Sequence, residues 1–148
     1  MHKNIISLIL LISTFNIFCQ EIERENGWYY LKPKDSTAKY LDLNDDFFIE
    51  NSLITIDYVE KITFINSKTR PFKQIQFDFN EEGKKLWEEQ SDIFKGKFVG
   101  FVFDNQVITI VFITTKINSG KVSFSSENPN IKTKELFEKL KIIVEKQR

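Results

Sequence analysis

Two apolar segments separated by only two residues constrain the fold most strongly. Residues 97–103 and 106–115 flank the dipeptide Asp104-Asn105. Both turn residues tolerate a positive φ, which a two-residue turn between antiparallel strands requires. We therefore predict a tight hairpin. The second segment is apolar on both faces over residues 107–113, which predicts a central strand rather than an edge strand.

Hydrophobic periodicity predicts further strands and two main helices. Ile75, Phe77 and Phe79 alternate with polar residues, which indicates a strand over 74–79. Asn80 is placed to cap a helix that buries Trp87, and Thr133 is placed to cap the last helix. The other expected elements are strands at 28–31, 62–65 and 121–125, a return strand at 38–43 that pairs with the first, and a short helix starting at Thr55.

These elements define the expected fold class, which is α+β. We predict a ferredoxin-like-type antiparallel sheet with two main helices packed on one face, plus an N-terminal β-hairpin and a short helix. The sequence shows no repeat, linker or low-complexity tract, so residues 20–148 are expected to form a single domain.

The N-terminus predicts a signal peptide over residues 1–19. A short basic start, Met1-His2-Lys3, precedes an apolar stretch at 5–18. A helix of roughly 14 residues reaches only about 21 Å, short of the ~30 Å hydrocarbon core of a bilayer. A stretch of this length is typical of a signal peptide. Cleavage after Cys19 would leave Gln20 as the first residue of an exported protein.

Cys19 leaves a second outcome open. A cysteine directly after an apolar stretch is where a lipoprotein is acylated, although that processing favours a small residue at the position of Phe18. The alternative to a soluble periplasmic protein is therefore a lipid-anchored structural protein of the cell envelope, without peptide-binding activity.

The distribution of reactive side chains limits the chemistry. His2 and Cys19 are the only histidine and cysteine, and both lie in the expected signal peptide. Residues 20–148 therefore lack the groups for Ser-His-Asp or Cys-His catalysis, thiolate or imidazole zinc sites, and disulfides. Basic and acidic residues balance at 21 each, so no positive excess attracts nucleic acid. We predict no enzymatic activity, no cofactor and no metal site.

Two sets of acidic and amide side chains are interpreted as solvent-exposed. The first is Asp42, Asn44, Asp45, Asp46 and Glu50, and the second is Asp78, Glu81, Glu82, Glu88, Glu89 and the turn residue Asp104. The first set offers oxygen ligands of the kind calcium prefers, but Phe47 and Leu53 stand where a calcium loop needs Gly and Glu. In the second set, interleaved lysines are typical of a solvent-facing helix. A carboxylate-based hydrolase is the alternative enzymatic hypothesis.

Three consecutive aromatic residues are the candidate partner-binding residues. They are Trp28, Tyr29 and Tyr30. Aromatic side chains dominate the energetics of many protein interfaces. Successive residues of a strand face opposite ways, so at least one of the three is expected to point into the core.

Four motifs between residues 74 and 125 carry a family resemblance. They are the alternating run from Ile75 to Phe79, Asn80-Glu81-Glu82-Gly83 with Trp87 one turn later, the run from Gly96 to Thr109, and the run from Ile117 to Val122. This segment resembles the head of the first extracytoplasmic domain of SecD and SecDF. It departs from the family at the turn, where Asp104-Asn105 replaces Asp-Gly, and at Thr109-Ile110-Val111, where the family has Ser-Ala-Pro.

The resemblance implies a fold and a setting more than an activity. The sequence has no counterpart of the membrane helices that carry proton coupling in SecD-type machines, so proton-driven translocation is not implied. In the family, the head is associated with handling secreted polypeptide. The expected function is therefore that of an exported, non-enzymatic envelope protein that binds a peptide or protein partner and no nucleic acid.

Overall fold

The structure is a computed structural model that describes residues 22–69 and 71–148. The predicted signal peptide at 1–19, including Cys19, lies outside the described residues. The elements in chain order are β1 (Gly27–Pro33), β2 (Phe47–Thr55), the 3₁₀ turn η1 (Ile56–Tyr58), β3 (Val59–Ile65), β4 (Gln74–Phe79), α2 (Glu81–Ile93), β5 (Phe98–Phe103), β6 (Gln106–Phe112), β7 (Lys121–Phe124) and α3 (Thr133–Lys146). The predicted α+β class, with antiparallel strands, two main helices and an N-terminal hairpin, is confirmed.

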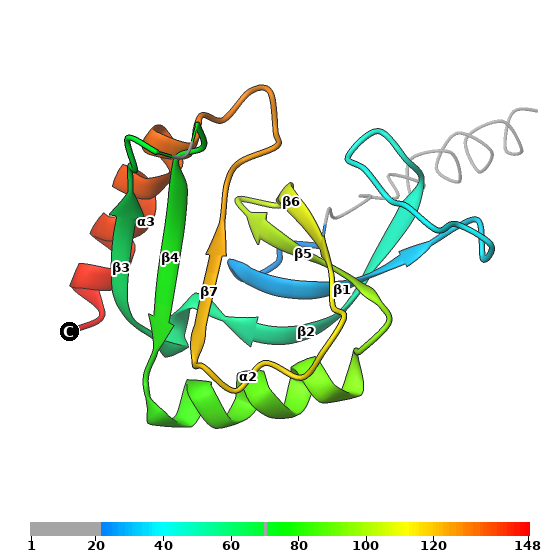
Figure 1. Cartoon of the computed structure of the whole chain (residues 1–148), viewed down its shortest axis with the longest axis horizontal. Coiled ribbons are helices and arrows are strands. Elements are labelled where there is room, and N and C mark those ends of the chain that lie inside the picture. Colours follow the sequence, from blue (N-terminus) through cyan, green and yellow to red (C-terminus); the bar gives the residue numbers. More distant parts are fainter. Residues whose placement is uncertain (1–21, 70) are drawn as a thin grey trace, which may run out of the picture.

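The strands are distributed over two antiparallel sheets. The first is four-stranded, with the order β2-β1-β5-β6, and the second is three-stranded, with the order β3-β4-β7. Figure 1 shows α3 beside β3 and β4, and α2 running across the ends of both sheets. The chain therefore passes from the first sheet to the second, back to the first, and again to the second.

The hairpin of β5 and β6 forms as predicted, but its second strand is not central. Asp104 and Asn105 have φ values of +47° and +61°, as a two-residue turn of this kind requires. However, β6 is an edge strand, because the next strand, β7, pairs with β4 in the other sheet. Val111 and Phe112 consequently remain 38% and 47% exposed.

The partner of β1 also differs from the prediction. The structure pairs β1 with β2, while residues 38–43, expected as the return strand, lie in the loop between them. Pairing with β2 buries the apolar side chains of Leu53 and Ile54. Because burial of apolar side chains stabilises a strand pairing, β2 is the preferred partner of β1. The predicted short helix is the 3₁₀ turn η1, and β3 begins at Val59 instead of at residue 62.

A cluster of aromatic rings joins the two sheets to α2. Trp28 of β1 lies 5.8 Å from Trp87 of α2 and 5.4 Å from both Phe101 of β5 and Phe124 of β7, measured between ring centroids. Phe77 of β4 is 5.4 Å from Phe101. These five side chains, called here the aromatic core, are buried, and their edge-to-face and tilted packing is the geometry that aromatic pairs favour.

The start of α2 follows the sequence prediction closely. The Gly83 amide donates to the Asn80 side-chain oxygen at 2.8 Å, so Asn80 is the N-cap. Glu81 and Glu82 lie in the first turn, where the helix dipole favours negative charge. The N-cap of α3 is Lys132, one residue before the predicted Thr133, whose hydroxyl instead accepts from the Ser126 amide at 3.0 Å.

Candidate functional site

The structure separates the three candidate aromatic residues. Trp28 is only 1% exposed because it belongs to the aromatic core. Tyr29 is buried on the opposite face of β1. Tyr30 is half-buried, and its ring lies 5.2 Å from that of Phe94 at the end of α2. In the folded protein, Tyr30 is therefore the member of the trio with a surface to offer a partner.

Tyr29 serves the structure as a hydrogen-bond donor. Its hydroxyl donates to the Glu25 carbonyl at 2.7 Å and fixes the segment that leads into β1. Burial raises the pKa of Tyr29 and the nearby Glu25 carboxylate adds to this, whereas a hydrogen bond with Ser52 opposes it. A raised pKa keeps the phenol protonated, as a donor must be.

A hollow lies beside Tyr30, where two paired strands separate. The antiparallel pairing of β1 with β5 ends at Leu31 and Phe98. Beyond that pair the two strands diverge and leave a pocket of about 260 Å³. Its lining residues, called here the fork pocket, are Tyr30, Lys32, Pro33, Ser36, Ala38, Gly96, Lys97 and Phe98.

The fork pocket combines an aromatic surface with positive charge. Its lining residues include two aromatic residues, Tyr30 and Phe98, and two lysines, Lys32 and Lys97, with no Asp or Glu among them. Lys32 is 3.9 Å from Glu50, and both side chains are substantially exposed, so this ion pair is weak. The arrangement suits an apolar group that carries a carboxylate nearby.

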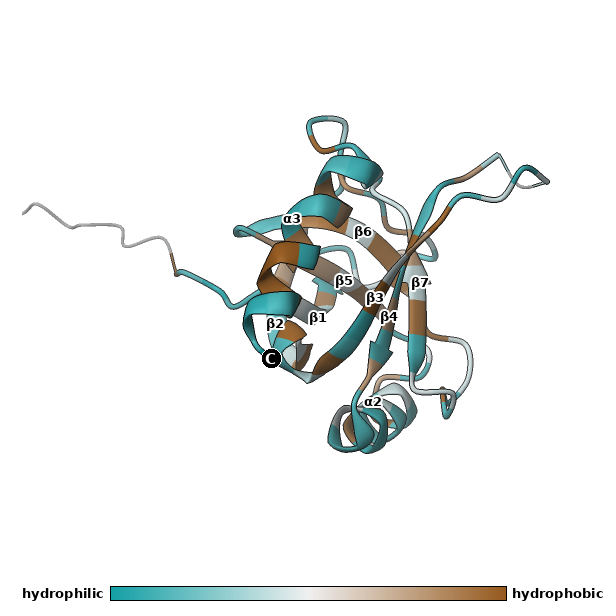
Figure 2. Cartoon of the chain, turned by 90° about the vertical axis from the view of Figure 1, so that its left-hand side faces the viewer, coloured by the Kyte–Doolittle hydropathy of each residue, from teal (hydrophilic) through white to brown (hydrophobic). Residues whose placement is uncertain are grey.

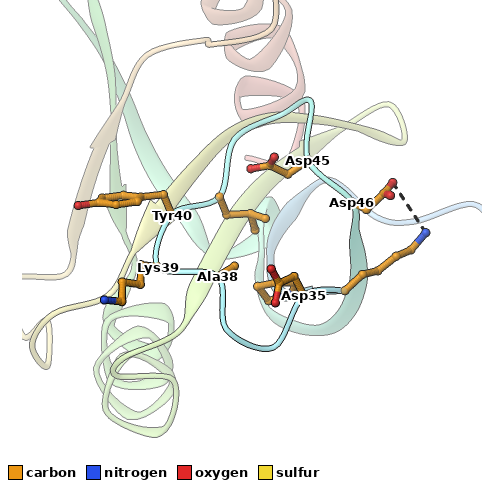
Figure 3. Close-up of a pocket in the computed structure, with 9 residues that line it drawn as sticks. Asp35, Ala38, Lys39, Tyr40, Asp45 and Asp46 are labelled. Carbon is orange, nitrogen blue, oxygen red and sulfur yellow. Dashed lines mark ion pairs between the residues drawn. The ribbon is translucent and has the colours of Figure 1, made fainter.

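A second hollow, of about 610 Å³, lies inside the loop between β1 and β2. Figure 3 shows Tyr40 and Lys39 extending to the side opposite Asp45 and Asp46. The Asp35 carboxylate accepts from the Thr37 hydroxyl and amide, and these bonds lower the pKa of Asp35. The Asp35 carboxylate is thus bonded within the loop and is less available to a ligand. We therefore take the fork pocket as the better candidate site.

The same loop contains the first acidic set of the sequence. Asp45 accepts from the Asp42 amide at 2.8 Å, and Asp46 lies 3.8 Å from Lys34. The loop is therefore exposed, and these carboxylates interact with groups of the loop and of the adjoining strand end. Within residues 22–69 and 71–148, no three His, Cys, Asp or Glu side chains are grouped so that they could hold a metal ion.

Members of the second acidic set are paired with lysines. Asp78 lies 3.6 Å from Lys121, and Glu88 lies 2.9 Å from Lys116. The hydrogen bond from Lys116 to Glu88, together with the Coulomb attraction between them, raises the pKa of Lys116. Asp104 occupies the hairpin turn, where its positive φ is a conformation that aspartate tolerates better than most residues.

Sequence comparison finds neither a matching family model nor a matching curated protein. The solved structures that share the fold include two of SecDF. One is the crystal structure of SecDF in the super-membrane-facing form, with a TM-score of 0.56 and 16% identity over 80% of this chain and 18% of that chain. The other is a structure of SecDF described as a membrane component that enhances protein export, with a TM-score of 0.56 and 17% identity over 85% of this chain and 63% of that one.

These similarities identify the fold as SecD-like and confirm the resemblance seen in the motifs. The chain spans less than two thirds of either SecDF chain, so it corresponds to a part of them. No helix in the described part of the chain is long and apolar enough to cross a membrane.

Sequence analysis missed most of the fork pocket. Lys97 and Phe98 lie inside a recognised motif, but nothing in their spacing indicates a hollow. Lys32 lies two residues after Tyr30 and attracts no attention by itself. The pocket exists because β1 and β5 stop pairing at Leu31 and Phe98. Because these strands are far apart in the chain, no local sequence pattern indicates where they separate.

Proposed function

We propose that this chain is an exported, non-enzymatic binding module with a SecD-like fold that holds segments of polypeptide outside the cytoplasm. The observation that carries the proposal is the fork pocket, whose lining residues include two aromatic residues and two lysines. The likeness to SecDF, of which one structure is described as enhancing protein export, supports the setting. The absence of imidazole and thiol groups from residues 20–148 supports a binding rather than a catalytic role.

The chemistry of the pocket defines the preferred segment. Tyr30 and Phe98 favour an aromatic or branched aliphatic side chain, while Lys32 and Lys97 favour an adjacent carboxylate. Unfolded polypeptides expose such combinations, and folded ones bury the apolar member. The module is therefore expected to prefer unfolded, acidic polypeptide over folded or basic polypeptide.

Charge reversal in the fork pocket tests this proposal. Reduced, carboxymethylated α-lactalbumin is a permanently unfolded, acidic probe whose binding is measured by fluorescence anisotropy. The double variant Lys32→Glu/Lys97→Glu is expected to bind it about tenfold more weakly, since replacing two attractive charges by repulsive ones costs on the order of 1.4 kcal/mol or more. The weakening is expected to shrink at high salt.

A matched control separates the pocket from net charge. Lys61 of β3 and Lys85 of α2 are both exposed, and neither lines the fork pocket. The variant Lys61→Glu/Lys85→Glu changes the net charge by the same amount and is expected to bind the probe within about twofold of the original protein. Equal weakening of the two double variants would contradict the proposal.

Export is tested by the mass of the mature protein. Because residues 1–19 are expected to be removed, the protein recovered from the cell envelope is expected to have the mass of residues 20–148, starting at Gln20. An excess mass of a diacylglycerol on Cys19 would support the lipid-anchored alternative. A functional cytosolic protein that retains Met1 would contradict export altogether.

A further inference from the structure

The outer edge of β6 carries backbone groups that no strand of its own sheet satisfies. The Ile113 amide donates to the Lys97 carbonyl at 3.0 Å, so the backbone at this position faces β5. The backbone of Ile110 faces the other way, and its amide donates to the Glu127 carboxylate at 3.1 Å. Backbone direction repeats every two residues along a strand, so Phe112 also directs its N–H and C=O outward.

Glu127 covers only the first half of this edge. Besides the bond to Ile110, its own amide donates to the Ile108 carbonyl at 2.9 Å. Among residues 22–69 and 71–148, no hydrogen bond of this kind reaches the outward-facing backbone at the far end of the strand, where Val111 and Phe112 are 38% and 47% exposed. The uncovered part of the edge is therefore centred on Phe112.

A row of large apolar side chains crosses the first sheet and ends at the same place. Ile49 is opposite Leu31, Leu31 is opposite Phe98, and Phe98 is opposite Phe112. The rings of Phe98 and Phe112 lie 5.1 Å apart. Phe112 thus has an apolar neighbour on its β5 side and water on the other, and a strand added along β6 would supply the missing neighbour.

The other edge of the sheet, formed by β2, is irregular and polar in its middle, and its exposed aromatic residue, Phe48, already has the Lys34 ammonium 5.4 Å from its ring centroid. The pairing of β2 with β1 contains two register irregularities, and the middle of β2 is the polar sequence Glu50-Asn51-Ser52. Bulges and polar or charged residues are the means by which proteins protect an exposed edge from added strands. The one irregularity between β5 and β6 lies near the turn, at Phe101 and Val102, away from Phe112.

From this contrast we propose that the edge of β6 at Phe112 binds an extended polypeptide as an additional antiparallel strand. The bound strand places a large apolar side chain opposite Phe112 and exchanges both backbone hydrogen bonds with it. Its C-terminal end reaches Glu127, whose carboxylate favours a basic residue there. The inference rests on the proposed function and adds the mode of binding, since the backbone groups of this edge are complementary to an extended chain of any source.

N-methylation of a peptide probe tests the hydrogen bonds directly. The acetylated and amidated peptide Thr-Val-Thr-Phe-Thr-Lys places its Phe opposite Phe112 and its Lys opposite Ile110, beside the Glu127 carboxylate. N-methylation of the Phe removes a bond to β6 and is expected to weaken binding about tenfold. N-methylation of the Thr that follows, whose N–H points away from β6, is the matched control and is expected to change affinity less than about twofold.

Two further measurements complete the test on the full mature chain. Peptide binding is expected to slow hydrogen exchange at the Phe112 amide and to leave the Ile113 amide, already bonded to Lys97, unchanged. The variant Phe112→Ala keeps the N–H and removes the ring, so it is expected to weaken binding severalfold while the N-methylation pattern persists. Binding to Phe112→Ala without any N-methylation difference would contradict backbone pairing.

The outcomes also separate this inference from the proposed function. Equal effects of the two N-methylations, or no binding of the parent peptide at about 1 mM, would overturn strand addition even if the fork pocket variants still lose affinity for unfolded α-lactalbumin. Concentration-dependent dimers that Phe112→Ala dissociates would show that a second copy of the chain occupies the edge, which also overturns it.

Discussion

Replacing Trp28 by alanine is expected to lower the free energy of unfolding by about 3–5 kcal/mol, the range observed when a large buried aromatic side chain is truncated. Trp28 is 1% exposed and its ring is in contact distance of rings from α2, β5 and β7. Removing it leaves a cavity at the point where the two sheets and the helix meet. Urea unfolding followed by far-ultraviolet circular dichroism measures the loss.

The variant Trp28→Phe is the control for volume and chemistry. The Trp28 indole N–H is buried and has no hydrogen-bond partner among the described residues. A buried, unpaired donor costs on the order of 1–3 kcal/mol, and phenylalanine lacks that donor while keeping most of the ring contacts. We expect Trp28→Phe to lower stability by no more than about 1.5 kcal/mol. An alanine variant as stable as the phenylalanine variant would show that Trp28 does not hold the sheets together.

Replacing Gly83 by alanine is expected to destabilise the protein by about 2 kcal/mol, although alanine is the better helix former by about 1 kcal/mol. A Cβ atom at this position would lie 2.7 Å from the Tyr58 Cβ and 3.1 Å from the Phe79 Cβ. It would also lie 3.2 Å from the Asn80 oxygen that caps the helix. The first turn of α2 must therefore move away from η1 and β4 to accept a methyl group.

The measurement decides whether Gly83→Ala lowers or raises the free energy of unfolding. Glu89→Ala, at an exposed position of the same helix, is the control and is expected to change the free energy of unfolding by less than about 0.5 kcal/mol. Both variants are compared by chemical denaturation under the same conditions. A stabilising effect of Gly83→Ala would mean that helix propensity outweighs the close approach seen in the structure.

Local patterns predicted the elements that depend on local chemistry. The alternation of Ile75, Phe77 and Phe79 gave β4, and Asn80 gave the start of α2 because an N-cap acts on amides only two or three residues away. The turn at Asp104-Asn105 followed from the two residues that adopt positive φ. In each case the physical cause and its effect lie within a few residues of each other.

Pairings between distant segments were beyond such patterns. Residues 107–113 are apolar enough for a central strand, but β6 is at an edge because β7 joins β4 instead. Similarly, the sequence pattern indicated Trp28, Tyr29 and Tyr30 as candidates without distinguishing among them. Which of the three reaches the surface depends on the face of β1 that packs against Trp87. The fork pocket depends on where β1 and β5 separate, so its two lysines could not be found from sequence.

The alternation of the chain between its two sheets has a consequence for how the molecule is made. β1 cannot pair with β5, and β4 cannot pair with β7, until these later strands have been synthesised. β5 begins about seventy residues after β1, and pairing between strands so far apart in sequence is slow. Each sheet combines strands from both halves of the polypeptide, so the first sheet is incomplete until β5 and β6 have been synthesised and the second until β7 has been.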